Sequence, residues 1–188
     1  LLSEGRDDTG GFAANKEVIH PPDREWSYSS GTTNIICRLM RDIIGNGATG
    51  MSAFLEENLF RPLGMRTPTP RFDTSGTFVG SSFLFATPQD FARFGYLYLR
   101  DGVWDGRRIL PEGWVDYART PTYQDDEQAY GAHWWLRPKT SWFMASGYDG
   151  QRILIAPDKD VIVVRCGRTN VEAIAPIWNR INDLVEQS

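Results

Sequence analysis

One stretch decides the kind of fold that this sequence forms: Arg152-Ile153-Leu154-Ile155-Ala156-Pro157-Asp158-Lys159-Asp160-Val161-Ile162-Val163-Val164-Arg165-Cys166. It holds two short apolar runs, 152–156 and 161–166, both rich in β-branched residues that favour strands. Pro and Asp, which are typical of turns, separate the runs. The pattern therefore predicts an antiparallel β-hairpin.

More strands and a helix are expected on either side of this hairpin. Upstream, the aromatic-rich segment Tyr130–Arg137 and the apolar run Trp142–Ala145 predict further strands. Downstream, apolar residues recur with helical spacing, and Pro176 lies near the start of that helix or kinks it. The apolar residues of this final helix are Ile174, Ile177, Trp178, Ile181 and Leu184.

The first half of the chain is predicted to be mainly helical. Residues 1–25 are polar and rich in turn residues, which indicates a surface segment with little regular structure. An apolar stripe predicts a helix capped by Ser30 or Thr32 and ended by Gly45. Further helices are expected at roughly 50–60, from Thr87 to about Arg100, and at 111–118, with an irregular stretch at 63–86. The stripe consists of Ile35, Ile36, Leu39, Met40, Ile43 and Ile44.

The order of elements predicts an α+β fold in one domain over residues 1–188, with the final helix packed on an antiparallel sheet. The helical region would cover about 1–125, and the strands and closing helix about 126–188. The sequence shows no internal repeat and no low-complexity linker.

Composition excludes several classes of function. With 24 acidic and 20 basic residues, the net charge of −4 argues against binding to nucleic acid or to an anionic membrane surface. No apolar run approaches the about 18 residues of a membrane helix. His20, His133, Cys37 and Cys166 show no spacing typical of a zinc site. We therefore expect no metal and no cofactor, and structural roles for these four residues.

Two short segments contain residues that can perform chemistry. Tyr28-Ser29-Ser30 precedes a capped helix, where a tyrosine can act as a general acid or base. Ser146-Gly147-Tyr148-Asp149-Gly150-Gln151 lies between two strands, where glycines allow close approach of a substrate and a backbone N–H can bind an oxyanion. Taken singly, the segments also fit a buried tyrosine with a serine cap and an ordinary hairpin turn.

Together with other segments, these motifs resemble the serine β-lactamase-like superfamily. Its members include class C β-lactamases, DD-peptidases, which are penicillin-binding proteins, family VIII esterases and 6-aminohexanoate-oligomer hydrolases. The segment Tyr28–Asn34 resembles the second motif of that family, Tyr-x-Asn or Tyr-x-Ser. The likeness covers about residues 20 to 185, and four connecting segments agree with it in order: Leu59–Met65, Thr87–Gly95, Trp104–Gly106 and Leu110–Val115.

The resemblance implies the C-terminal part of a β-lactamase/transpeptidase-like fold. The third family motif, Lys/His-Thr/Ser-Gly, falls on Ala145-Ser146-Gly147, where alanine replaces the usual cation or imidazole. A cation there helps to hold a substrate carboxylate. Its replacement argues against a β-lactamase or a DD-peptidase. The segment Gly147-Tyr148-Asp149-Gly150-Gln151 is more similar to the esterase and amide-oligomer hydrolase branch.

The first family motif, Ser-x-x-Lys, does not occur in the sequence. We expect it upstream, because Leu1-Leu2-Ser3 resembles the segment that follows the nucleophile helix. The chain would then be a C-terminal fragment, inactive alone, of a serine hydrolase that cleaves an ester or amide through an acyl-serine. The resemblance implies that Tyr28 and Ser30 serve catalysis, and that Ser146, Gly147 and the Tyr148 N–H contact the substrate.

Partners and alternatives follow from this interpretation. A sheet without its first strands exposes an edge, which favours pairing with the missing N-terminal segment or with a second copy. The substrate would be a small-molecule ester or amide. A non-catalytic binding or sensor module of the same fold, and an unrelated α+β domain, are the alternatives. The sequence does not decide between an exported and a cytoplasmic protein.

Overall fold

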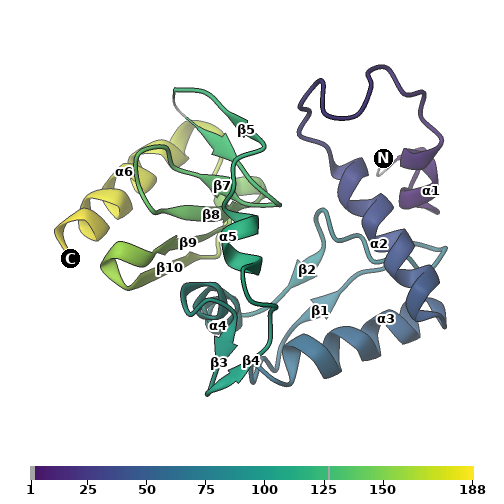
Figure 1. Ribbon diagram of the computed structural model, residues 1–188, viewed down its shortest axis with the longest axis horizontal. Coiled ribbons are helices and arrows are strands. Elements are labelled where there is room, and N and C mark those ends of the chain that lie inside the picture. The colour runs from purple at the N-terminus through teal and green to yellow at the C-terminus, as the bar shows by residue number, and fades with distance from the viewer. Residues whose placement is uncertain (1–2, 127) are drawn as a thin grey trace. The chain divides into compact units, whose positions relative to one another are not determined.

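The computed structural model describes residues 3–126 and 128–188, without the side chains of Val171 and Glu172. The expectation for Leu1-Leu2 therefore lies outside the described residues. The chain divides into two compact units, one ending at Ala86 and the other comprising Thr87–Ser188. Figure 1 shows helices in both units and antiparallel strands in the second, so the predicted α+β class is confirmed.

The first unit consists of short helices and one small β-ribbon. Its elements are α1 (Thr9–Ala14), α2 (Ser30–Ile44), α3 (Gly47–Leu55), a π-helical turn η1 (Glu56–Phe60), β1 (Thr69–Pro70) and β2 (Leu84–Phe85). The prediction of little regular structure in residues 1–25 is wrong at α1. There the Asp8 side chain caps the helix by accepting a hydrogen bond from Gly11 N (2.9 Å). Gly10 permits close packing, because a Cβ on it would lie 2.7 Å from Asn34 O.

Helix α2 packs through its polar side. Asn34 and Cys37 are buried, and Arg41 Nη1 donates to Ser75 Oγ (2.8 Å) and to Thr77 Oγ1 (2.9 Å). The helix matches its predicted range, but half of the apolar stripe faces outward. The exposed members of the stripe are Ile36 at 44%, Leu39 at 57% and Ile43 at 84%.

The second unit is built on a six-stranded antiparallel sheet with the order β10-β9-β8-β7-β6-β5. The strands are β5 (Tyr123–Gln124), β6 (Ala129–Tyr130), β7 (Trp135–Leu136), β8 (Phe143–Ser146), β9 (Arg152–Ala156) and β10 (Val161–Arg165). The other elements are α4 (Pro88–Leu99), the ribbon β3 (Val103–Trp104) with β4 (Arg107–Arg108), α5 (Trp114–Ala118), the 3₁₀ turns η2 (Tyr148–Gly150) and η3 (Pro157–Lys159), and α6 (Val171–Gln187).

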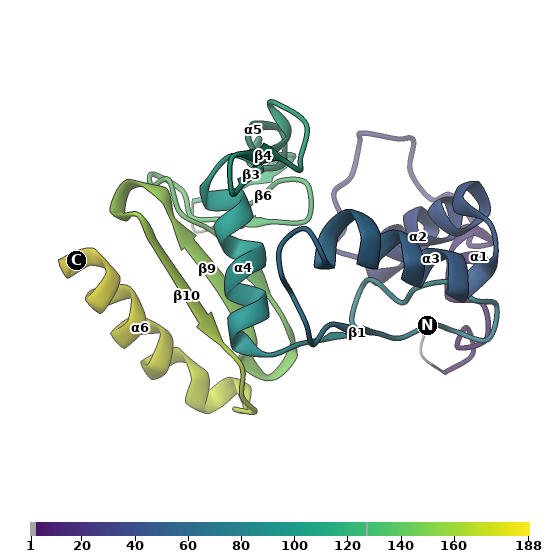
Figure 2. The same ribbon diagram turned by 90° about the horizontal axis from the view of Figure 1, so that it is seen from below.

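Helices cover both faces of this sheet (Figure 2). On one face, Ile153 and Ile155 pack with Phe94 of α4. On the other, Leu154 and Ala156 pack with Val185 of α6. Strand β9 is therefore buried on both sides, which explains its continuous apolar run. The predicted contact of the final helix with the sheet is present, and α4 adds a layer that was not predicted.

The predicted strand Tyr130–Arg137 is interrupted. A turn over residues 131–134 separates β6 from β7, with His133 at a φ of 65°. Trp134 in this turn is buried and stacks on Phe94, with ring centroids 6.1 Å apart. Burial of the Trp134 side chain against Phe94 outweighs the strand preference of the segment here.

The close approach of α4 to the sheet depends on Gly95. A Cβ at this position would lie 3.0 Å from Ile153 Cγ2 and 3.1 Å from Ile162 Cγ2. We expect Gly95→Val to lower the free energy of unfolding by about 1–3 kcal/mol, because overpacking forces the helix from the sheet. Urea unfolding measures this. Gln89→Val, at an exposed position of α4, is the control and should stay within about 0.5 kcal/mol of the parent. Equal losses in both variants would contradict the packing argument.

Candidate functional site

Tyr28 and Ser30 line the same cavity of the first unit. Its volume is about 510 Å³, and its walls come from the end of α1 and the start of α2. Tyr28 is 59% exposed and its ring lies beside Trp26, with centroids 6.4 Å apart. Tyr28 is therefore an exposed residue at the edge of a cavity. The structure does not show the alternative, a buried core tyrosine. The remaining lining residues are Phe12, Ala13, Lys16, Ser29, Gly31, Thr32 and Ile35.

The local structure at the start of α2 positions these two side chains. Ser29, with extended backbone, is the N-cap, and its Oγ accepts a hydrogen bond from Gly31 N (3.1 Å). The prediction that Ser30 or Thr32 caps the helix is therefore wrong by one residue or more. Because Ser29 performs the capping, the Ser30 hydroxyl is not needed for the helix and lines the cavity.

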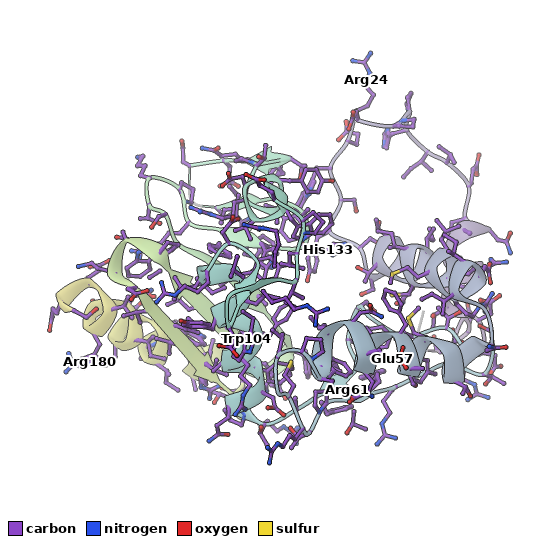
Figure 3. All side chains as sticks on the ribbon, turned by 60° about the horizontal axis from the view of Figure 1, so that its bottom comes forward. Arg24, Glu57, Arg61, Trp104, His133 and Arg180 are labelled. Atoms are coloured by element: carbon purple, nitrogen blue, oxygen red, sulfur yellow. The ribbon has the colours of Figure 1, made fainter. Side chains whose placement is uncertain are left out.

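The opposite wall of the cavity is fixed through Asp73. Thr9, the first residue of α1, donates to Asp73 Oδ2 from both its backbone N (2.8 Å) and its Oγ1 (2.8 Å). Asp73 Oδ1 also accepts from Ser75 Oγ (2.7 Å) and Thr77 N (2.9 Å). Figure 3 shows Arg24 on the segment that leads from α1 to α2, the same segment that ends at Tyr28. Asp73 thereby anchors one end of the chain that frames the cavity.

Ser146, Gly147 and Tyr148 form one turn in the second unit. Ser146 ends β8 opposite Arg152 of β9. The Gly147 N–H donates to Gln151 O (2.8 Å), so it is already used by the turn. The next N–H along the chain is that of Tyr148, whose side chain is 88% exposed. This N–H is the candidate oxyanion donor.

The side chains of Gln151 and Arg165 hold this turn. Gln151 Nε2 donates to Gly167 O (2.7 Å), and Gln151 Oε1 accepts from Gly167 N (2.9 Å). Arg165 Nη1 donates to Gly150 O (2.8 Å), and Thr169 N donates to Asp149 O (3.0 Å). These bonds tie the turn to the chain after β10. Gln151 ends the quoted glycine segment, but its partners lie 16 residues away and carry no local signal.

The predicted residues thus form two groups, one in each unit. The structure brings Tyr28 and Ser30 to one cavity, and it places Ser146, Gly147 and Tyr148 in one turn. Ala145, at the position of the usual family cation, is partly buried and packs against the core on the α4 face. Ala145 therefore contributes to core packing, and its side chain carries no charge that could bind a substrate carboxylate.

The histidines and cysteines do not form a metal site among the described residues, where no group of three potential ligands occurs. Cys37 is buried, and this burial raises the pKa of its thiol despite a backbone hydrogen bond with Gly80. Burial also lowers the pKa of His133, which favours its neutral imidazole. Among the helices within residues 3–126 and 128–188, none has the length and apolarity to cross a bilayer.

A helical unit followed by an antiparallel sheet with helices on both faces is the fold class of the β-lactamase-like hydrolases. A family model described as Beta-lactamase matches residues 3–179. The chain belongs to this family, as its motifs indicate.

Known proteins agree with this assignment. The chain is 23% identical over 154 residues to the 6-aminohexanoate-dimer hydrolase of Paenarthrobacter ureafaciens, covering 75% of this chain and 38% of that protein. A Bacillus anthracis structure with the provisional name 6-aminohexanoate-dimer hydrolase matches 93% of this chain and 47% of its own, at TM-score 0.80 and 23% identity. A structure from Bacteroides dorei DSM 17855, provisionally named a beta-lactamase, matches 99% of this chain and 68% of its own, at TM-score 0.67 and 14% identity. The chain spans less than half of the first two proteins.

The carboxylate of Asp73 makes the first unit sensitive to acid. Burial alone raises the pKa of Asp73, but hydrogen bonds from Ser75, Thr9 and Thr77 outweigh it and leave the pKa below its ordinary value. A carboxylate whose pKa is lowered in the folded state stabilises the fold at pH values above its unfolded pKa of about 3.9. This stabilisation is lost as the pH falls through the folded-state pKa. We expect Asp73→Asn to cost about 1–3 kcal/mol at pH 7 and to flatten the loss of stability below pH ~4.

Thermal unfolding between pH 7 and 2.5 measures this effect. Asp23→Asn is the matched control, since Asp23 is exposed and its φ of 63° suits asparagine. It should leave both the stability and its pH dependence unchanged. An Asp73→Asn variant with the stability and the acid profile of the parent would refute the anchoring role.

Proposed function

We propose that this chain supplies the acid–base tyrosine and one oxyanion donor of a serine hydrolase that cleaves a small ester or amide through an acyl-serine. One observation carries the proposal: Tyr28 is exposed on a cavity at the start of a capped helix, in a chain of the beta-lactamase family. Relatives named 6-aminohexanoate-dimer hydrolase support a small-molecule substrate.

In the proposed reaction a serine Oγ attacks the substrate carbonyl. Tyr28, sharing protons with a lysine, accepts the serine proton and delivers it to the leaving amine or alcohol. The C–N or C–O bond breaks, and water then releases the acid from the acyl-serine. Ser30 donates or accepts a hydrogen bond in the cleft beside Tyr28. No serine of this chain is followed by lysine three residues later. In this proposal the nucleophile and the lysine would come from another segment, and the chain alone would be inactive.

The second unit would contribute electrostatic stabilisation. The Tyr148 N–H would bind the developing oxyanion together with the N–H of the nucleophilic serine, while Ser146 and Gly147 border the substrate. Losing one such donor typically costs about 10²–10³ in rate. The bonds from Gln151 and Arg165 support this role, since an oxyanion donor must be held in place before the reaction.

Two surfaces support a need for a further segment. The outward side of α2 bears the exposed apolar side chains of Ile36, Leu39 and Ile43. An apolar stripe on a helix normally packs against another part of the protein or against a partner. Strand β10 is the last strand of the sheet and has a neighbour on one side only in the described chain. We propose that the segment with Ser-x-x-Lys covers the stripe and pairs with β10; a second copy of this chain is the competing occupant.

The role of Tyr28 is tested in the longer protein obtained by extending the coding region upstream of Leu1. Tyr28→Phe should lower kcat for p-nitrophenyl esters by about 10²–10⁴ with little change in KM, because it removes the proton relay and preserves the ring. Tyr117→Phe is the control, since Tyr117 is an exposed tyrosine of α5 outside both groups. This chain without the extension should not exceed the buffer rate.

Three results would contradict the proposal. Full activity of Tyr28→Phe would remove its central residue, and turnover by this chain alone would place the nucleophile within it. An upstream coding region without Ser-x-x-Lys would favour the non-catalytic binding or sensor module of the same fold.

The apolar stripe is tested by complementation between this chain and the upstream segment. Leu39→Glu with Ile43→Glu should abolish complementation, because two charges would be buried in the contact. Both side chains are exposed here, so the stability of the chain alone should stay within about 0.5 kcal/mol. Val18→Glu, another exposed apolar position, should complement normally. Complementation by the double variant would show that the segment does not cover the stripe.

A further inference from the structure

A second cavity lies within the second unit, and its lining includes no residue of the Ser146–Tyr148 turn. Its volume is about 170 Å³, room for about five or six water molecules at ~30 Å³ each. It lies where the loop between β7 and β8 meets the end of α5. The lining residues are Arg119, Pro121, Gln124, Ala129, Leu136, Arg137, Pro138, Lys139, Thr140, Ser141 and Trp142.

The lining of this cavity is cationic. Among the described residues, this lining contains Arg119, Arg137 and Lys139 and no acidic side chain, although the whole chain has a net charge of −4. One of the three charges is balanced from outside the lining, because Arg137 Nη2 donates to Glu186 Oε1 (3.0 Å). A second carboxylate borders the lining, because Asp158 Oδ1 accepts a hydrogen bond from Trp142 Nε1 (2.9 Å). One positive charge remains in excess among the described residues, and this excess favours an anion.

The two guanidinium groups are held in fixed planes. Arg137 lies over the ring of Trp142, 4.8 Å from its centroid, and Arg119 lies over Phe143 at 5.0 Å. Arg119 Nη2 also donates to Ser141 O (3.1 Å). Stacked and hydrogen-bonded arginines lose little freedom when they bind, which suits recognition of a planar oxyanion.

One donor at this site lacks an acceptor. Arg137 Nη1 is buried and has no hydrogen-bond partner in the part of the chain that the structure describes. An unpaired buried donor on a charged group is costly, and native structures rarely keep one without a ligand or water. This is an independent indication that an acceptor belongs beside Arg137.

The cavity is separate from the Tyr148 turn. Trp142 borders the cavity just before β8, whereas Ser146 ends that strand. Four residues of extended chain span about 13 Å at ~3.3 Å per residue. A guest here would therefore not occupy the oxyanion position proposed for Tyr148.

We propose that this cavity binds a small carboxylate that carries a short apolar group. The arginines match the two oxygens of a carboxylate. The remaining lining combines an apolar part at Ala129, Leu136 and the Trp142 ring with the polar side chains of Gln124, Thr140 and Ser141. Inorganic phosphate satisfies the cations but not these walls, so the carboxylate binds more tightly. This inference is independent of the proposed hydrolysis.

The test is a titration of this chain at low salt, followed by the amide and indole N–H signals in ¹H–¹⁵N NMR spectra. Butyrate should bind saturably and shift the signals of Trp142 and Lys139. Butyramide, the neutral analogue, should not bind, and phosphate should bind at least about threefold more weakly. Equal binding of butyramide, tighter binding of phosphate or the absence of saturation with butyrate would each overturn the proposal.

Lys139→Gly separates binding from folding. Lys139 has a φ of 64°, a conformation that glycine adopts more readily, so the variant should fold at least as stably as the parent. Loss of this one exposed charge should weaken butyrate binding about threefold to fivefold. Arg107→Met, an exposed residue of β4 outside the cavity, makes the same change in net charge and should bind normally. Equal weakening in both variants would indicate a general charge effect and overturn the assignment.

Discussion

The second unit depends on the burial of β9 from both sides. Its alternating side chains pack in turn against α4 and α6, so Ile155 belongs to one layer and Leu154 to the other. A shift of the β9 register by one residue would turn each set of side chains toward the wrong helix, so that neither α4 nor α6 would pack correctly. The register of β8 and β10 against β9 is thereby set, and with it the position of the turn that presents Tyr148. The geometry of this candidate site is a consequence of core packing one strand away.

Each unit then adds a polar clamp where the core does not reach. Gln151 and Arg165 bond the Tyr148 turn to the chain after β10, and Asp73 bonds the start of α1 beside the Tyr28 cavity. Both sets of hydrogen bonds join residues distant in sequence and hold backbone groups, namely Gly150 O, Gly167 and the Thr9 N–H. A rigid backbone matters for the proposed chemistry, because an oxyanion donor that must reorganise during the reaction stabilises little charge.

Local signals were sufficient to predict much of this fold. The cap at Thr87, the end of α2 at Gly45 and the β9–β10 hairpin are correct because a few neighbouring residues determine them. The sequence could not show which side of α2 would be covered, since a stripe of apolar residues indicates a preference and not its partner. Helix α1 was not predicted, because glycine is typical of turns. Here Gly10 instead allows α1 to pack closely against α2. The clamps were missed because their partners are far apart in the chain.

The order of strands in the sheet has a consequence for how the chain acquires its structure. Every strand from β5 to β10 pairs with its neighbour in sequence, so each pairing closes a short loop and costs little chain entropy. Such local topologies fold quickly compared with sheets that join distant strands. We expect the meander to form early, hairpin by hairpin, as the ribosome releases it. The open edge at β10 would then offer a finished template on which a partner strand can add last.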